Sequence, residues 1–469
     1  MGMVTANEYM ERIAAMNSTV WLDGEKIRGP VTKHPAFTSV IKSKANLYDL
    51  VHKPEYRAIL QADDGSSNFS WEPMTTRERL AKRRLATQLW QMKMPAYSDV
   101  LLNMGIRSQH LLVRKIILRL PVSNYGEAIE QLYENAKRAD LTFTHTFVNP
   151  KAKKSTSFFS KEEEQPIAAK VVDETDAGIV IEGARCSPLK AELPMKSYCP
   201  QDRRITCSLS PFLLTQKDPF RGRSYSKDSL FDEPYSSQFE EGDAIVVFDS
   251  VFIPWERVFL YKNEELAKRL FFDTGLESAL LFHASNRQIV KTEWILGIAN
   301  EMVNTLKIGQ FQHIQQKVSE IITALEAMRG FVYSSEMQAE INLYGMMVPK
   351  AAPLKTAVSY YQNTYGRLVE IIQLIGASNF IATPNEKDFE SEIAPLLERF
   401  MGGYEASAKD RIRLFRLAKD LTMGDFGSRQ TQFERYFYGD PIRLQSGLCL
   451  DYNLEPYSSR VRNFLEKLK

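Results

Sequence analysis

The chain has 469 residues, of which 44% are apolar and 25% are charged. These are ordinary values for a globular protein, and the length excludes a miniature fold and predicts about two to four packed units. Its 60 lysines and arginines nearly balance 58 aspartates and glutamates, so the charge gives no indication of a nucleic-acid partner.

The N-terminal segment MGMVTANEYMERIAAM carries acidic residues early, which indicates an amphipathic helix rather than a signal peptide. No later stretch approaches the roughly 18 apolar residues that a membrane span requires. The cysteines form no CxxC pair and are too few for a disulfide framework, so we expect buried free thiols and no metal site. This cysteine usage fits a protein of the reducing cytoplasm. The cysteines are Cys186, Cys199, Cys207 and Cys449.

Helices are predicted up to about residue 141. The segments TTRERLAKRRLATQLWQM and NYGEAIEQLYENAKRAD place apolar residues three and four positions apart, and Thr75 and Thr76 are candidate N-caps of the first segment. From residue 142 to 268 strands predominate, because KVVDETDAGIVIEGARC predicts a hairpin with Asp176 and Gly178 in its turn. DAIVVFDSVFIPWERVFLY predicts a second strand pair.

The helical period returns beyond residue 269, where apolar residues line one stripe that we interpret as bundle core rather than as a cofactor site. Breaks near YGMMVPKAAP and IATPNEKD predict an antiparallel bundle of about four helices. We therefore expect an α+β multidomain protein with a mainly helical N-terminal domain (1–141), a middle β domain (142–268) and a C-terminal helical bundle with a tail segment (269–469). The stripe consists of Phe311, Ile314, Val318, Ile321, Leu325 and Met328.

This order of domains resembles the acyl-CoA dehydrogenase-like architecture, in which the β domain and the bundle form a flavin-sized cleft and subunits usually pair through their bundles. Five segments carry a second resemblance. The first, VWLDGEKIRGPVTKHPAF, contains Thr32, His34, Pro35 and Phe37. It is followed in the chain by THTFVNP, ETDAGIVIEGAR, FDSVFIPWERVF and DRIRLFRLAKDLTMGDFGSRQTQFERYFYGDP. With these segments in this order, the chain resembles the oxygenase components of the 4-hydroxyphenylacetate 3-monooxygenase family from about residue 7 to 445.

The resemblance implies a two-component flavin monooxygenase. A separate NAD(P)H:flavin reductase would supply reduced FAD by diffusion, and the oxygenase would use O2, through a flavin C4a-hydroperoxide, to hydroxylate a phenol ortho to its hydroxyl group. The sequence has no glycine-rich dinucleotide fingerprint after a strand, which fits a separate reductase. We expect a cytoplasmic homodimer or homotetramer whose partners are a small phenolic substrate and the reductase, with no nucleic acid and no membrane.

Three catalytic residues are implied by the resemblance. His145, in THTFVNP, matches the histidine that bonds the phenol beside the flavin, and imidazole exchanges protons near neutral pH. The family's Arg-Ser-Pro-Asp-Tyr element is replaced here by KMPAY, which contains Lys93 and Tyr97. Tyr97 retains a hydrogen-bond donor for a developing phenolate, whereas Lys93 supplies a point charge without the planar fork of arginine. This change indicates a reshaped substrate pocket, unless Lys93 is a solvated surface lysine.

The resemblance also implies the FAD-binding residues. The backbone after His145 would lie along the flavin ring, and the loop after Arg185 would flank it. That loop contains Leu189 within SPLK, where many relatives carry an Ala-Thr-Leu-Ala run, so the threonine expected near the flavin N5 is missing. Gly376 remains from a glycine-rich turn near the pyrophosphate or adenosine, and Arg429 either contacts an FAD phosphate or forms a salt bridge within the bundle. The implied set is Thr146, Val148, Asn149, Arg185, Leu189, Gly376 and Arg429.

Other functions are weighed against this one. A 4-hydroxybutyryl-CoA dehydratase has this architecture, but its iron–sulfur cluster needs three cysteines and a histidine, and no cysteine follows His283 within ten residues. We expect His283 to pack at a helix start near the cleft. A non-catalytic or repurposed flavin-binding relative and an N-oxidising biosynthetic member of the family remain alternatives. An ordinary acyl-CoA dehydrogenase is disfavoured because no catalytic carboxylate stands at a matching position.

Overall fold

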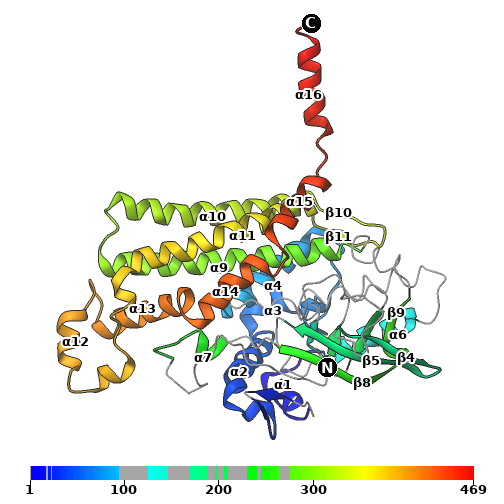
Figure 1. Cartoon of the computed structure of the whole chain (residues 1–469), viewed down its shortest axis with the longest axis horizontal. Helices are drawn as coiled ribbons and strands as arrows, with labels where there is room; N and C mark the ends of the chain where they lie inside the picture. Colours follow the sequence, from blue (N-terminus) through cyan, green and yellow to red (C-terminus); the bar gives the residue numbers. More distant parts are fainter. Residues whose placement is uncertain are drawn as a thin grey trace.

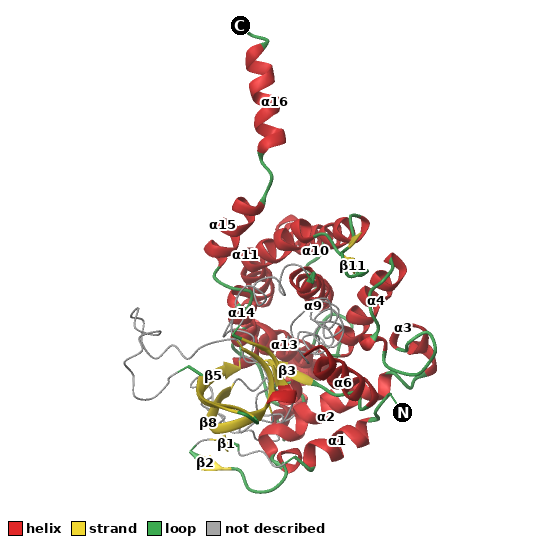
Figure 2. Cartoon of the chain, turned by 90° about the vertical axis from the view of Figure 1, so that its right-hand side faces the viewer, coloured by secondary structure: helices red, strands yellow, loops and turns green. Residues whose placement is uncertain are grey.

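The computed structural model has three parts in the predicted order (Figure 1). Short helices come first, strands occupy the middle of the chain, and long helices form the C-terminal half. Figure 2 shows the strands of the middle part gathered below the long helices. The structure describes residues 2–16, 20–22, 24–94, 125–145, 168–187, 196–198, 205–209, 230–239, 244–262 and 274–469.

Local sequence signals explain where the first two helices begin. Thr5 and Glu8 form a reciprocal capping box at the start of α1 (Ala6–Ala14), so the predicted N-terminal helix is confirmed. The next long helix is α2 (Pro35–Leu50), which has proline in its first turn. His34 caps α2, because its Nδ1 accepts a hydrogen bond from the backbone N–H two residues later, at 3.3 Å.

The two helices predicted from periodicity are also confirmed. Thr76 accepts a hydrogen bond from the backbone N–H of Arg79 at 3.2 Å and begins α4 (Arg77–Lys93). The second is α6 (Tyr125–Arg138). The short elements of this part are β1 (Trp21–Leu22), β2 (Glu25–Lys26), η1 (Val31–Lys33), η2 (Pro54–Tyr56), α3 (Arg57–Leu60) and η3 (Phe69–Trp71).

The middle part contains a three-stranded sheet, in the order β4-β5-β8, and a four-stranded sheet, in the order β3-β6-β7-β9. The predicted hairpin is confirmed as β4 (Lys170–Thr175) and β5 (Gly178–Ser187), which pair antiparallel. A Cβ on Gly178 would lie 2.1 Å from the Ile253 carbonyl oxygen, so this close approach requires glycine. The remaining elements are β3 (Phe143–His145), β6 (Lys196–Tyr198), β7 (Ile205–Leu209), α7 (Ser236–Phe239), β8 (Ala244–Pro254), η5 (Trp255–Arg257) and β9 (Val258–Tyr261).

The second predicted strand pair is wrong in its pairing. β8 and β9 both form, but β8 pairs with β5 and β9 pairs with β7, so consecutive strands belong to different sheets. The 3-10 turn η5 lies between them and follows Pro254. This turn directs the chain from one sheet to the other, because a short 3-10 connection reorients the backbone without a hairpin loop.

Three long helices, α9 (Leu276–Leu306), α10 (Gln312–Met337) and α11 (Ala351–Gly376), lie side by side in the C-terminal part (Figure 1). α13 (Ala408–Thr422) packs on α9 and α11, and α14 (Asp425–Tyr436) packs on α11. The bundle of about four helices is therefore confirmed, with the fourth position shared by two shorter helices. The other elements are β10 (Glu340–Ile341), β11 (Met347–Val348), η6 (Ala377–Phe380), η7 (Glu386–Glu390), α12 (Ala394–Met401), α15 (Pro441–Asp451) and α16 (Glu455–Glu466).

Most of the predicted apolar stripe is bundle core. Ile314, Ile321, Leu325 and Met328 are buried on α10. Phe311 is the exception, because it stands at the N-cap of α10, outside the helical period, and its side chain is 47% exposed.

α4 contributes to two hydrophobic cores. Ala86, Trp90 and Met94 pack in a core formed by the N-terminal helices together with β5 and β8. Leu80, near the start of the same helix, packs in the core of the bundle. α4 thus lies where the β part and the bundle meet, while the predicted boundaries at residues 141 and 268 stay predictions.

The C-terminal tail projects away from the body and ends in α16 (Figures 1 and 2). Every residue from 451 to 469 is exposed except Ser459. Cys449, just before this segment, is also exposed, so the expectation of a buried thiol is wrong there. Each helix within the described ranges is too short or too polar to cross a bilayer.

Candidate active site

Lys93 is the last residue of α4. Its side chain is exposed, and its Nζ lies 5.2 Å from the centroid of the Tyr56 ring, at cation–π distance. The helix ends here because proline follows Met94 and because the Gln91 side chain donates a hydrogen bond to the Met94 carbonyl at 3.1 Å. Lys93 therefore stands at the point where the chain leaves α4 towards Tyr97, which lies outside the described residues.

His145 is the last residue of β3. The strand pairs in parallel with β6, and His145 is in register with Tyr198. Only the backbone of His145 belongs to the described structure. Its position at the end of a strand agrees with the predicted junction into the β part. The predicted cofactor contacts Thr146, Val148, Asn149 and Leu189 fall outside the described residues.

Arg185 is a buried cation on β5, with 3% of its surface exposed. Its Nη2 donates a hydrogen bond to the Ala169 carbonyl at 3.1 Å. A bulge precedes it on the strand, where Gly183 has φ +108° and a Cβ would lie 2.6 Å from the Ala168 carbonyl oxygen. Glycine permits this conformation, and such a bulge changes the direction in which the following side chains point.

The structure groups some of the predicted site residues and separates others. Met94, beside Lys93, and Ala169, which accepts from Arg185, belong to the same hydrophobic core. Gly376 lies instead in the bundle, at the end of α11. A Cβ at this position would lie 2.2 Å from the Phe380 ring, so the close approach of that ring requires glycine here. Arg429 is half-buried on α14.

A buried charge cluster within the bundle escaped the sequence interpretation. Glu434 on α14 accepts hydrogen bonds from both Arg287 and Lys291 on α9, and none of the three side chains is more than 1% exposed. The Arg287 Nη2 to Glu434 Oε2 distance is 2.8 Å, and Lys291 Nζ lies 2.6 Å from Glu434 Oε1 and 2.7 Å from Gln430 Oε1. Burial alone would raise the pKa of Glu434, but the two cations lower it to about 2.

A second buried carboxylate holds a segment between the β part and the bundle. Asp420 on α13 accepts hydrogen bonds from the backbone N–H groups of Tyr235 at 2.7 Å and Ser236 at 2.9 Å, and from the Ser236 hydroxyl at 2.6 Å. Burial raises the pKa of Asp420, although these donors oppose the change. The Tyr235 ring stacks on Phe426 with centroids 5.3 Å apart. These contacts attach the residues that precede β8 to the bundle.

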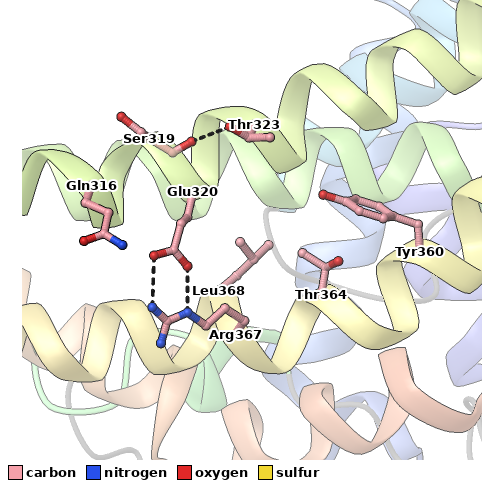
Figure 3. A pocket seen from close by; sticks show the side chains of 8 residues that line it. All are labelled: Gln316, Ser319, Glu320, Thr323, Tyr360, Thr364, Arg367 and Leu368. Atoms are coloured by element: carbon pink, nitrogen blue, oxygen red, sulfur yellow. Dashed lines mark hydrogen bonds and ion pairs between the residues drawn. The ribbon is translucent and has the colours of Figure 1, made fainter.

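A surface cleft of about 380 Å³ lies between α10 and α11 (Figure 3). Glu320 crosses it to Arg367 in a bidentate ion pair, with distances of 2.7 and 3.0 Å. The walls come from those two helices alone, so this cleft is separate from the region between the bundle and the β part. It is lined by Gln316, Ser319, Glu320, Thr323, Tyr360, Thr364, Arg367 and Leu368.

The arrangement defines the class of protein. Helices, then a β part, then a helical bundle is the acyl-CoA dehydrogenase-like α+β fold expected from the sequence. A solved 4-hydroxybutyryl-CoA dehydratase from N. maritimus has the same fold, with a TM-score of 0.83 at 17% identity over 99% of this chain and 95% of its own. The predicted fold class is therefore confirmed.

The family follows from closer similarities. The pattern described as 4-hydroxyphenylacetate 3-hydroxylase N terminal matches residues 5–191 and 216–260, and the corresponding C-terminal pattern matches residues 267–466. A probable 4-hydroxyphenylacetate 3-monooxygenase of Bacillus subtilis is 36% identical over 99% of both chains. The chain belongs to the 4-hydroxyphenylacetate 3-hydroxylase family.

A solved structure agrees with this membership. It is the oxygenase component of a 4-hydroxyphenylacetate 3-monooxygenase complexed with FAD and 4-hydroxyphenylacetate. It is 33% identical to this chain, with a TM-score of 0.90 over 99% of this chain and 98% of its own. The similarity thus extends over nearly the whole length of both chains.

Proposed function

We propose that this protein is the oxygenase component of a two-component flavin monooxygenase, which uses reduced FAD and O2 to hydroxylate a phenol ortho to its hydroxyl group. The observation that carries the proposal is the full-length similarity to an oxygenase that binds FAD and 4-hydroxyphenylacetate. When bound, reduced FAD supplies the electrons that activate dioxygen. The protein must hold the phenol, exclude water and manage its proton.

The described residues that fit an FAD site are cationic. Arg185 is a buried guanidinium on β5, two residues before the strand ends, and guanidinium groups bind phosphate and flavin oxygens well. Arg429 is half-buried on α14, which leaves it a candidate for an FAD phosphate. The contacts predicted at Thr146, Val148, Asn149, Leu189 and Gly376 stay proposals.

The catalytic roles follow from the chemistry of three side chains. His145 shares a proton with the phenol, so that its oxygen gains negative charge and the ortho carbon becomes nucleophilic. Tyr97 donates a hydrogen bond to that oxygen. Lys93 adds a positive charge at the end of α4, where its exposed amine is available to a ligand. Because a lysine makes one point contact instead of a bidentate one, we expect a different phenol preference from that of an arginine-containing site.

The roles are tested with the purified protein, chemically reduced FAD, oxygen and a panel of phenols. His145→Ala is expected to keep FAD binding and lose hydroxylated product, and Tyr97→Phe is expected to form less product and more hydrogen peroxide. Lys93→Arg is expected to raise the yield with 4-hydroxyphenylacetate. Product yields equal to the parent's in the first two variants would reject the assignment.

Two partners belong to the proposal. A separate reductase supplies reduced FAD by diffusion, and a second copy of the chain completes a homodimer or homotetramer in the cytoplasm. The assembly of two or four copies is supported by α16, whose apolar side chains are exposed: Tyr457 at 49%, Val461 at 60% and Phe464 at 62%. A helix with such a surface is normally covered in solution.

Truncation tests the assembly. A chain that ends at Leu454 lacks α16 and removes no side chain from either hydrophobic core. Its mass in solution, measured by light scattering, is expected to be lower than that of the full chain. An unchanged mass would show that α16 does not hold the copies together.

A further inference from the structure

One face of α4 carries a row of polar contacts to the bundle, which we call the α4 seam. Arg84 Nε lies 3.0 Å from both carboxylate oxygens of Glu336 on α10. One turn further along the helix, Thr87 Oγ1 lies 3.3 Å from His283 Nδ1 on α9. The next contact, from Gln88 Nε2 to the Oδ1 of Asn286 on α9, is 3.0 Å long.

The middle of the seam is buried. Thr87 is 1% exposed, His283 is 5% exposed and Asn286 is fully covered. Asn286 is itself fixed, because its Nδ2 donates to the Phe282 carbonyl at 2.8 Å. Interdigitated apolar side chains restrict the register of α4 on α9, and directional polar contacts restrict it further. Buried polar pairs prevent sliding, because any other register leaves their donors and acceptors without partners.

The opposite face of α4 packs towards the β part through Ala86 and Trp90. The seam therefore fixes the helix that lies between the bundle and the β part, where the proposed reaction takes place. Lys93 lies six positions after Thr87, which is about 9 Å along a helix axis. A shift at the seam is passed to Lys93, because the intervening helix is rigid and Gln91 holds the carbonyl of Met94 directly after the helix.

We infer that His283 is a positioning residue for the hydroxylation, which it serves by holding Thr87 and hence the C-terminal end of α4. The inference rests on the proposed function and deepens it. His283 touches neither phenol nor flavin in this role. Its effect is to keep Lys93 at the distance from the phenol that couples oxygen use to product. Displacements of about 1 Å in such elements lower rates by up to roughly 100-fold.

Thr87→Val tests the inference with little change in side-chain volume, because valine carries a methyl group where threonine has its hydroxyl, so only the polar contact is lost. We expect the ratio of hydroxylated product to oxygen consumed to fall by about tenfold, with FAD affinity within about twofold of the parent's. Thr87→Ser keeps the hydroxyl and is expected to restore the ratio. His283→Ala is expected to reproduce the loss, and the Thr87→Val and His283→Ala double variant is expected to lose no more than either single variant.

Thr292→Val is the matched control. Thr292 is also a buried threonine on the bundle, but its hydroxyl contacts Gln288 and Tyr361 instead of α4. We expect this variant to be destabilised without losing coupling. An equal loss of coupling in both valine variants would overturn the inference, since any buried defect would then suffice. A Thr87→Val variant that couples as well as the parent would overturn it too.

Hydrogen exchange separates this inference from the proposed function. In protein without FAD, the backbone amides of the last turn of α4 are expected to exchange faster in Thr87→Val than in Thr87→Ser or Thr292→Val. Unchanged exchange would contradict the role of the seam whatever the enzyme does. A parent protein that hydroxylates no phenol would reject the proposed function, and the exchange result would still decide whether the seam holds α4.

Discussion

The buried Glu434 carboxylate is paired with two cations at once, so its replacement by glutamine is expected to destabilise the bundle strongly. Glu434→Gln keeps the shape of the side chain but leaves Arg287 and Lys291 without their carboxylate. Neither cation can reach water, because both are almost fully covered. Breaking a buried ion pair from one side costs about 3–5 kcal/mol.

The lowered pKa of Glu434 gives a second value for the free energy that these ion pairs contribute. A fall from 4.5 to about 2 corresponds to about 3 kcal/mol of preference for the charged form in the folded protein. This contribution is present above the ordinary glutamate pKa and is lost as the pH falls from about 4.5 towards 2. In a chain of this length, a loss of about 3 kcal/mol lowers the midpoint of thermal unfolding by several degrees.

Glu320→Gln is the matched control, because Glu320 also makes a bidentate ion pair with an arginine of the bundle. That pair is 33% and 41% exposed, and exposed pairs contribute about 1 kcal/mol or less. Thermal unfolding followed by circular dichroism at neutral pH compares the two variants. Equal, small shifts of the midpoint in the two variants would show that the buried Glu434 ion pairs stabilise the protein no more than the exposed Glu320 pair. Adding Arg287→Met to Glu434→Gln removes one stranded cation and is expected to recover part of the lost stability.

Two further predictions concern stability. Burial lowers the pKa of His34, whose neutral ring caps α2. The stability that this cap contributes is present above about pH 6.5 and falls at lower pH, where His34 is protonated in the unfolded chain. His34→Asn keeps an acceptor for the cap, so the urea midpoint of this variant should vary less between about pH 7 and pH 5. Gly376→Ala forces the buried Phe380 ring to move and should cost about 1–3 kcal/mol. Gly330→Ala is the control, because nothing lies within 4 Å of the added Cβ, and it should stabilise α10 by up to about 1 kcal/mol. A Gly376→Ala variant at least as stable as the parent would show that the Phe380 ring does not require glycine at position 376.

The sequence predicts those elements whose signals are local. Thr76 begins α4 because an N-cap and the helical period lie within the same few residues, and the β4–β5 hairpin forms around a short turn that ends at Gly178. The pairing of β8 with β5 lacks such a signal. It depends on which strand lies beside β8 in space, and a three-residue turn after Pro254 places its sequence neighbour β9 in the other sheet.

The charged core shows a second limit of sequence reasoning. Arg287 and Glu434 are 147 positions apart, and nothing near either residue predicts the other. The polar residues between Ser285 and Thr292, a stretch interrupted only by Ile289 and Val290, were an available signal, because a helix packed on several sides has no solvent-exposed face for them. The site residues implied by the family resemblance lie in two separate parts of the structure. Lys93 and Arg185 border one core, whereas Gly376 belongs to the bundle.

The most direct test of the central claim is a single-turnover experiment. Purified protein is mixed without oxygen with one equivalent of reduced FAD and excess 4-hydroxyphenylacetate or another phenol of the panel, then exposed to oxygen, and the products are quantified by mass spectrometry. We expect an ortho-hydroxylated product that contains one atom from labelled O2, in amounts that exceed those from reduced FAD alone. Complete conversion of the oxygen to hydrogen peroxide, with no hydroxylated product from any phenol, would contradict it.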